Sequence, residues 1–532
     1  MKKTISLMLV LGLCMVAKGD FTFSTPTNLG LPVNSFDHDR SPSIRADGLE
    51  MYFTSERDGG EGTIDIWVST RAKKEDDWGA PTNLGPTINT WEWQTSPCIS
   101  ADGLELIFND WGLWVVRRAT VSDPWGEKEK DSLINVNTSN VNSGPCLSSD
   151  GLSLFLFSWE KKELYVSTRP TRDELWSEPV NLGPTVNGVN STWENSRPGI
   201  SADGLVLFFT SDRPGGSGNT DLWMTRRSTI DGPWSEPVNL GPTINSGRWE
   251  YHPEISADGR SLLFCSNRDY SDHDIYQAEV RPVVDLNGDG QVDGKDLLCM
   301  AAQWDTDDTL CDIGPYAWGD GIVDVQDVVA LAEYIGKDIN DPTLIAHWPL
   351  DETEGILTRD IISGNDAYIM GNPIWVSDDG QVGGALQLDG VGDYVITASA
   401  LDPADGPFSV LTWIKGGAPG QVIISQSMGA NYLMLDAEGR LMTELASIGL
   451  NSSPLISEIK INDGQWHRVA LVWNGQYRKL CVDNAVVAED MQDGLAGSGN
   501  RLYIGAGRNT ETGTYWSGMI DDVRIYNRVV RP

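Results

Sequence analysis

The stretch DLNGDGQVDGKD, Asp285–Asp296, places acidic or amide side chains at alternate positions around a glycine. Numbered from the first aspartate, positions 1, 3, 5, 7, 9 and 12 are Asp285, Asn287, Asp289, Gln291 through its backbone carbonyl, Asp293 and Asp296. Hard oxygen donors at this spacing suit Ca2+, and Gly290 at position 6 permits the sharp bend that such a loop needs. The stretch therefore predicts a calcium site, with Ca2+ as the cofactor.

A variant copy follows in GDGIVDVQDVVALAEYIG, residues 319–336. The residues that match positions 5, 9 and 12 are Asp320, Asp324 and Asp327. Counting back places Tyr316 and Trp318 at positions 1 and 3, where neither offers a side-chain ligand. Asp312 takes the first position if the loop carries an insertion through Pro315. We therefore expect a second, altered calcium loop.

The elements around these loops are short. No helix is expected before the first loop, whereas a short apolar helix follows each loop. A loop with only an exit helix, present twice over residues 285–338, resembles a dockerin module. That resemblance implies a cohesin-type scaffold partner, and a calcium-stiffened spacer between two β-domains is the alternative. Val292 and Val323, both at position 8, are expected to pair the two loops, and Cys299 and Cys311 are close enough in sequence for a disulfide.

Residues 20–282 contain five repeats of 50 to 55 residues. Their common core is a strand, a Ser-x-Asp-Gly turn and a second strand, as in CISADGLELIFND at 98–110. A third strand such as DLWMTRR at 221–227 follows, and then a segment with Trp and Asn-Leu-Gly, as in WSEPVNLG at 234–241. Four short strands per repeat of about 50 residues predict the blades of a β-propeller.

The two ends of this region complete one blade. The fifth repeat has no fourth strand, and FSTPTNLG at 23–30 supplies one from the N-terminus. Pairing them closes the ring and leaves no open sheet edge. We therefore predict five blades, and the motifs resemble those of the TolB-like, WD-repeat-like propellers. This resemblance implies a fold far more than an activity.

An aromatic–acid pair precedes the first strand of four repeats. The pairs are Phe36-Asp37, Trp91-Glu92, Trp193-Glu194 and Trp249-Glu250. Such residues could maintain blade packing. They could also ring the channel mouth, where aromatic rings stack on sugars and carboxylates bind hydroxyl groups or perform acid–base chemistry. The ligand-binding candidates are Trp91, Glu92, Trp193, Glu194, Trp249 and Glu250, and the alternative catalytic candidates are Asp37, Glu92, Glu194 and Glu250.

Residues 344–532 alternate apolar and polar positions between Gly, Asn and Asp turns, which predicts an antiparallel β-sandwich. The motif order, from LIAHWPLDETEG to WSGMIDDVRIYNRVV, resembles the laminin-G-like, concanavalin A-type jellyroll. That resemblance implies binding of carbohydrate or glycoprotein. A structural calcium could involve Asp351, Asp360, Asp389 or Asp521, and Trp413, Trp466 and Trp473 are expected in the core.

The remaining features limit the class of function. Residues 1–19 have a basic start, an apolar stretch and a small-x-small end, which predict a bacterial export signal and a secreted or surface-associated protein. No later stretch predicts a membrane span. A net charge of −37 argues against nucleic-acid binding.

The fold expected is therefore mainly β: a five-bladed propeller, a small helical calcium module and a jellyroll. No hydrolase elbow, zinc-protease, P-loop or dinucleotide motif is present. The leading hypothesis is a secreted, non-catalytic protein that binds polysaccharide or surface glycan. The alternative is a glycoside hydrolase or lyase that uses the propeller carboxylates.

Overall fold

The computed structural model describes residues 21–130, 133–138, 141–189, 192–269, 272–337, 341–398, 400–447, 453–497 and 501–532. The predicted export signal at 1–19 lies outside these residues. The chain forms two compact units, Phe23–Arg281 and Pro282–Pro532, the second of which also includes residues 21 and 22. Each is built mainly of β-strands, as expected. Among the described residues, no helix combines the length and apolar character needed to cross a bilayer.

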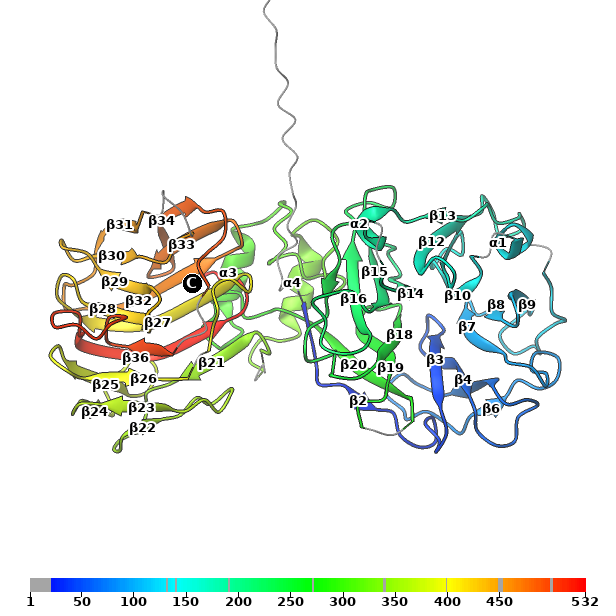
Figure 1. Ribbon diagram of the computed structural model, residues 1–532, viewed down its shortest axis with the longest axis horizontal. Helices are drawn as coiled ribbons and strands as arrows, with labels where there is room; N and C mark the ends of the chain where they lie inside the picture. Colours follow the sequence, from blue (N-terminus) through cyan, green and yellow to red (C-terminus); the bar gives the residue numbers. More distant parts are fainter. Residues whose placement is uncertain are drawn as a thin grey trace, which may run out of the picture. The chain divides into compact units, whose positions relative to one another are not determined.

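The first unit is a propeller of five antiparallel sheets (Figure 1). The first blade contains β3 (Asp39–Ile44), β4 (Glu50–Ser55), β5 (Asp65–Thr70) and β6 (Thr82–Asn83). The second contains β7 (Thr95–Ile99), β8 (Glu105–Asn109) and β9 (Leu113–Arg117). The third contains β10 (Ser143–Leu147), β11 (Ser153–Ser158), β12 (Glu163–Thr168) and β13 (Val180–Asn181). The fourth contains β14 (Asn195–Ile200), β15 (Val206–Ser211), β16 (Asp221–Arg226) and β17 (Val238–Asn239). The fifth contains β18 (Glu250–Ile255), β19 (Ser261–Ser266) and β20 (Asp274–Pro282), with β1 (Phe21–Phe23) and β2 (Thr27–Asn28).

The ring closes as the sequence predicts. β2 pairs with β20 through Thr27 opposite Gln277 and Asn28 opposite Tyr276, so the N-terminal segment completes the last blade. The inner strands β3, β7, β10, β14 and β18 each pack against two neighbours, and residues of all five line a central channel. The second blade departs from the pattern, because its expected fourth strand is reduced to one bridge between Val115 and Glu129.

An asparagine in every blade, buried in four blades and half-buried at Asn137, fixes the loop that leads to the next blade. Its side-chain oxygen accepts the N–H, and its side-chain nitrogen donates to the C=O, of one residue at the start of the third strand. The five pairs, with distances of 2.7–3.0 Å, are Asn34 with Ile275, Asn89 with Ile66, Asn137 with Leu113, Asn187 with Leu164 and Asn245 with Leu222. We call these five residues the asparagine clamps. Two short helices, α1 (Ile134–Thr138) and α2 (Pro184–Asn187), carry two of them.

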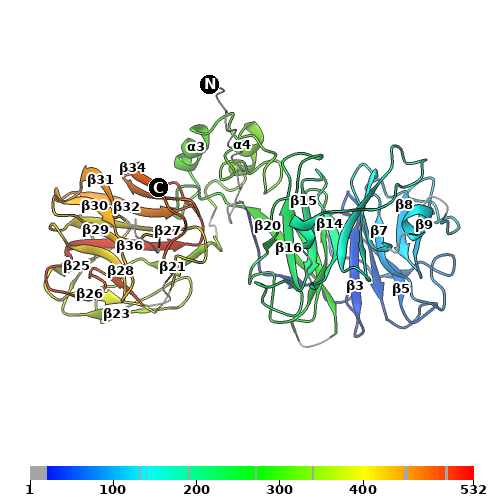
Figure 2. The same cartoon turned by 45° about the horizontal axis from the view of Figure 1, so that its top comes forward.

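The second unit contains a sandwich of two eight-stranded antiparallel sheets (Figure 2). One sheet contains β21 (Leu344–Trp348), β24 (Ile374–Val376), β25 (Ala385–Asp389), β27 (Phe408–Gly416), β32 (Trp466–Trp473), β33 (Tyr477–Val482), β34 (Ala485–Met491) and β36 (Ser517–Tyr526). The other contains β22 (Leu357–Thr358), β23 (Ala367–Met370), β26 (Tyr394–Ile396), β28 (Val422–Gln426), β29 (Asn431–Leu435), β30 (Arg440–Thr443), β31 (Leu455–Lys460) and β35 (Leu502–Ile504).

The tryptophans of this core are only partly those expected. Trp473 lies in the core between the sheets together with Trp348 and Trp516, all at most 2% exposed. Trp413 and Trp466 are only half-buried and lie outside the core, contrary to expectation. Alternate residues of a strand face opposite sides of its sheet, so a strand position alone does not show which side is covered.

Two helices of the second unit, α3 (Gly294–Ala301) and α4 (Val325–Ala332), pack against each other (Figure 2). The segment around them, residues 284–334, has its own small apolar core, which includes Val292, Val323 and Cys311. Val292 and Val323 of the two loops thus share one core, whereas their backbones bond elsewhere: Gly336 N donates to Val292 O, and Val323 pairs with residues 305 and 306. Cys299 and Cys311 are free, because the Cys311 thiol contacts the carbonyl of Cys299 instead of its sulfur.

The asparagine clamps should dominate the stability of the propeller. We expect Asn245→Ala to lower the free energy of unfolding by about 1–3 kcal/mol, because the N–H of Leu222 would lose its buried partner, while the C=O of Leu222 would keep the amide of Leu240. Urea unfolding followed by tryptophan fluorescence measures the effect. Asn219→Ala, at an exposed site in the same blade, is the control. Equal unfolding midpoints for the two variants would contradict the clamp's importance.

Candidate ligand-binding channel and calcium loops

The same local distortion occurs in all five inner strands. Each contains a residue with positive φ, between 51° and 54°, followed at once by proline, and the pairing register shifts at that point. Such a bulge leaves an extra residue outside the ladder and turns its side chain. The five residues that precede the prolines are Ser41, Ser96, Gly144, Arg197 and His252, and all line the channel.

In four blades, the side chain of the residue after the proline links neighbouring blades. Ser43 accepts the amide of Ile99 at 3.1 Å, and Glu254 accepts that of Ile44 at 2.9 Å. The two cysteines act in the same way, because Cys98 accepts the amide of Leu147 at 3.1 Å and Cys146 that of Ile200 at 3.3 Å. Burial raises the pKa of both thiols. The fourth blade has Gly199 here, where a Cβ would lie 2.2 Å from the carbonyl of Pro253.

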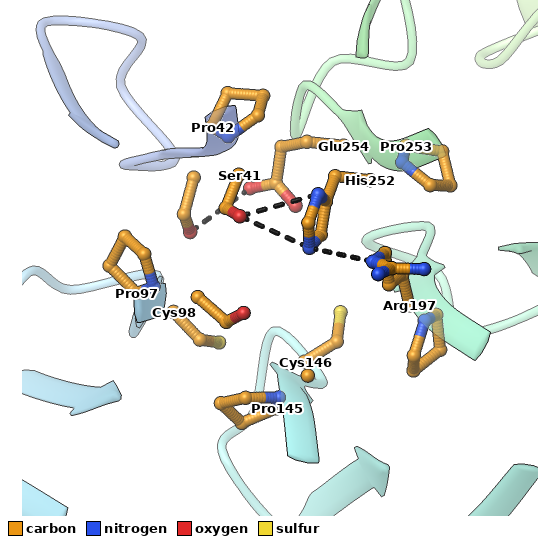
Figure 3. Close-up of a pocket in the computed structure, with 14 residues that line it drawn as sticks. Ser41, Pro42, Pro97, Cys98, Pro145, Cys146, Arg197, His252, Pro253 and Glu254 are labelled. Carbon is orange, nitrogen blue, oxygen red and sulfur yellow. Dashed lines mark hydrogen bonds between the residues drawn. The ribbon is translucent and has the colours of Figure 1, made fainter. Parts of the chain in front are cut away.

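Ser41, His252 and Arg197 form a hydrogen-bonded chain at the channel (Figure 3). Arg197 Nε donates to His252 Nε2 at 3.1 Å, so that nitrogen carries no proton. The Ser41 hydroxyl lies 3.1 Å from the same nitrogen and 3.3 Å from Nδ1. Burial, and then the cations Arg197 and Arg40, hold the pKa of His252 well below its ordinary value. The arrangement differs from a hydrolytic triad, since an arginine stands where a carboxylate would orient the histidine.

The channel opens into a cavity of about 620 Å³, within the range of ~300–1,000 Å³ typical of ligand pockets. Three highly exposed tryptophans line it: Trp93 at 58%, Trp111 at 78% and Trp159 at 59%. The remaining lining residues are Arg40, Ser41, Thr54, Ile64, Thr95, Ser96, Asn109, Gly112, Asn142, Ser143, Phe157, Arg197 and His252. Aromatic surface with a few polar groups is the composition expected of a site for a polar organic ligand.

None of the aromatic–acid residues predicted from the sequence lines this cavity. The four pairs are not equivalent: counted back from the inner-strand proline, Asp37 and Glu92 stand five residues away, Glu194 four and Glu250 three. A shift of one residue along a strand moves a side chain to the other face. The pairs therefore do not form a set of equivalent side chains around this cavity.

Each of these residues has a different environment. Phe36, Asp37, Trp91 and Trp249 are exposed, whereas Glu92 and Trp193 are half-buried. Glu194 pairs with Arg197 at 3.2 Å and so contacts the cavity indirectly. Glu250 is fully buried and accepts hydrogen bonds from Ser246, Ser266 and Arg268, which makes it a structural group. Trp93, two residues after Trp91, does line the cavity. The sequence pattern did not distinguish it from Trp91.

The first calcium loop is a tightly hydrogen-bonded turn. Asp285 accepts the amides of Gly288, Asp289 and Gly290, while Asp296 accepts those of Leu286, Asn287 and Asp293. Asp293 caps α3 through a reciprocal capping box with Asp296. Asp289 pairs with Lys295 at 2.6 Å. The role of the Gln291 backbone carbonyl as a ligand stays a prediction. Burial raises the pKa of Asp285 to about 6.

The second loop repeats this arrangement with an insertion. Asp312 accepts the amides of Asp320 and Gly321 at 2.9 and 2.7 Å, as Asp285 does for Asp289 and Gly290. Asp327 accepts the amides of Ile313 and Gly314 and forms a capping box with Asp324. The position-3 ligand has no counterpart, since Tyr316 and Trp318 stack on each other at 5.2 Å. The geometry thus places Asp312 in the first position.

The chemistry of the first loop suits a hard cation, because it presents carboxylate oxygens and the amide oxygen of Asn287. Among the residues that the structure describes, however, no three His, Cys, Asp or Glu side chains are grouped as a metal site. The carboxylates instead accept amides of their own loop. Calcium binding at either loop therefore stays a prediction.

The first loop also packs against the sandwich within the same unit. Arg468 donates to the carbonyls of Asn287 and Gly288 at 3.2 and 2.9 Å, and the fully buried Arg528 donates to that of Asp285 at 2.6 Å. The Tyr526 hydroxyl donates to the Gly288 carbonyl at 3.2 Å. The module is therefore joined to β32 and the end of β36 by charged and polar contacts.

The four aspartates suggested for a calcium in the sandwich separate into different places. Asp351 and Asp521 lie at one loop. Asp351 accepts the amide of Gly384, and Asp521 accepts those of Gln381 and Val382. Oδ1 of Asp521 is buried without a partner among the described residues, and burial raises the pKa of this carboxyl to about 7. Asp389 and Asp360 instead cap turns of their own.

Comparison with known proteins supports the C-terminal domain. Residues 389–532 match the family model of the concanavalin A-like lectin/glucanases superfamily, and the sandwich of this unit is a concanavalin A-like jellyroll. No curated protein matches the chain.

Solved structures show only distant likeness. The binding domain of Paraclostridial mosquitocidal protein 1 is 10% identical, with a TM-score of 0.30, 35% of this chain covered and 49% of that one, about half its length. Domain 4 of AbnA, a GH43 extracellular arabinanase from Geobacillus stearothermophilus in complex with arabinotriose, is 16% identical, with a TM-score of 0.27 and coverages of 35% and 94%. Trypanosoma rangeli sialidase is 12% identical, with a TM-score of 0.29 and coverages of 95% and 84%. TM-scores this low support no conclusion about activity.

Glu254 should make the propeller less stable as the pH rises. Burial raises the pKa of this carboxyl from 4.5 to about 7, so the folded state holds a proton that the unfolded state releases between these values. Stability is then lost between about pH 4.5 and pH 7. We expect Glu254→Gln to reduce this loss, measured as urea midpoints at pH 5 and pH 7.5. An unchanged pH dependence would contradict the raised pKa.

Proposed function

We propose that this protein is an exported, non-catalytic binding protein for carbohydrate, with the propeller cavity as its principal site. The observation that carries the proposal is the set of exposed tryptophans, Trp93, Trp111 and Trp159, around one cavity with Asn109 and Asn142. Indole rings stack against the apolar faces of sugar rings, while amides and hydroxyl groups bind sugar hydroxyls. The concanavalin A-like domain supports the same class of ligand.

The cavity favours binding over glycoside hydrolysis. Most glycosidases need two carboxyl groups that flank the scissile bond, whereas the described residues that line this cavity include no aspartate or glutamate. Glu254 lies in the narrow channel, where it already accepts the amide of Ile44. Cleavage of any bound glycan would contradict the non-catalytic part of the proposal.

For the calcium module we propose a structural role as an integral spacer of the C-terminal unit. The support is that the side chains of Arg468, Tyr526 and Arg528 donate hydrogen bonds to backbone carbonyls of the first loop. These carbonyls are therefore engaged within the chain. In the cohesin alternative, the module would bind a scaffold partner in a calcium-dependent manner, and a pull-down with and without EDTA would detect it.

Trp111→Ala should weaken glycan binding by about tenfold or more, because stacking of an aromatic side chain contributes on the order of 1–3 kcal/mol when removed from a binding site. A glycan array followed by calorimetry on the best ligand measures this loss. Trp91→Ala is the matched control, since Trp91 is as exposed, at 79%, but lies outside the cavity. A loss confined to Trp91→Ala would contradict the proposed site.

Calcium should stabilise the C-terminal unit. At a free Ca2+ concentration one hundred times the Kd, we expect a gain of about 2.7 kcal/mol, seen as a higher Tm in calorimetry that EDTA removes. Asp285→Ala should abolish the calcium-dependent part of this gain at the first loop. Asp307→Asn, at an exposed position of the same segment, should retain it. No difference between calcium and EDTA would contradict the proposal.

A further inference from the structure

The charge of the propeller cavity contrasts with that of the whole chain. The protein has 76 acidic and 39 basic residues. Two of the basic residues, Arg40 and Arg197, line the cavity, and none of its described lining residues is acidic. A pocket with arginines but no carboxylates of its own is suited to an anionic group, which would be repelled by most of the remaining surface.

Arg197 is held in a fixed orientation beside the aromatic residues. Its guanidinium lies 5.3 Å from the ring centre of Trp159 and 5.3 Å from that of Tyr251. Nε donates to His252, and Nη1 donates to Glu194 at 3.2 Å and to the Ser196 hydroxyl. In the described part of the chain, Nη2 has no hydrogen-bond partner. Stacking and two anchored nitrogens reduce the entropy lost when that group binds a ligand.

Arg40 offers a second cationic group at the same cavity. Its Nη2 donates to Glu56 at 2.8 Å, and its Nε is buried without a hydrogen-bond partner among the described residues. Glu56 and Glu194 offset part of the charge of the two arginines from outside the cavity lining. Burial lowers the pKa of His252 most, and the nearby cations Arg197 and Arg40 lower it further.

We propose that the cavity binds an acidic saccharide, with the carboxylate of a uronate unit paired to Arg197 and Arg40 and the sugar rings against Trp111 and Trp159. This inference rests on the proposed carbohydrate binding and names its ligand class. Guanidinium groups bind carboxylates with strong, charge-assisted hydrogen bonds, while the tryptophans bind the sugar faces. A neutral sugar would leave the arginines without this partner.

Calorimetry on the full chain can test the proposal with hexamers of galacturonate, mannuronate and glucuronate and with the methyl esters of each. At least one acid should bind about tenfold or more tightly than its ester, because a hydrogen bond to a charged group contributes roughly 1.5–3 kcal/mol. Raising the NaCl concentration should weaken binding of the acid and leave binding of the ester unchanged.

Variants of Arg197 and Arg40 test whether these residues cause the preference for the acid over the ester. Arg197→Lys, which retains the charge but loses the planar fork, and Arg40→Gln should each weaken acid binding about tenfold without changing ester binding. Arg117→Gln is the control, since this partly exposed arginine of β9 pairs with Glu105 and Glu129 and lies outside the cavity. The Tm of each variant shows whether it is folded.

The outcomes separate this inference from the proposed function. Equal binding of acids and esters, with loss in Trp111→Ala, would overturn the acidic ligand and leave carbohydrate binding intact. Acid binding that survives both arginine variants would also overturn it. If no acidic or neutral glycan bound the wild-type chain in the array, both proposals would fail.

Discussion

The propeller depends on one repeated interaction, the bidentate hydrogen bond between an asparagine and one backbone position of the third strand. Each asparagine clamp accepts an N–H and donates to the C=O of the same residue, and in four blades this C=O also accepts a backbone amide from the fourth-strand segment, such as that of Leu240 at Leu222. The clamp also fixes the loop through which the chain crosses to the next inner strand. Asn34 does this across the ring closure, because it binds Ile275, so the first segment of the chain holds the last blade.

The inner strands that these loops deliver share a second constraint, the bulge before each proline. Since the bulged residue keeps a positive φ in every blade, all five of these residues line the channel whatever their chemistry. The residues after the prolines join the blades, and this explains why Cys98 and Cys146 occur at matching positions without forming a disulfide. Repetition thus builds the scaffold, whereas departures from it, such as Arg197 and His252, give the channel its chemistry.

In the C-terminal unit, the corresponding constraint is electrostatic. The first acidic loop presents its carbonyls to Arg468 and Arg528, which are buried and would be costly without such partners. A loop that looks like an independent calcium module in the sequence is therefore part of a larger folded unit. The second loop retains the same carboxylate–amide pattern although four more residues separate its first two acids, as the spacings Asp285–Asp289 and Asp312–Asp320 show.

The sequence by itself determined the five repeats, the closure of the ring, the two acidic loops and the β-sandwich. These follow from local periodicity, turn residues and spacing, which depend on neighbours along the chain. Only the tertiary structure decided which side chains meet. The aromatic–acid pairs look alike in sequence, yet a bulge and one-residue shifts send Glu250 into a buried network and leave Trp91 outside the cavity, while Trp93, Trp111 and Trp159 converge on it. Which side chains are buried and which converge depends on contacts between residues that are far apart in the sequence. Local sequence patterns do not predict these contacts.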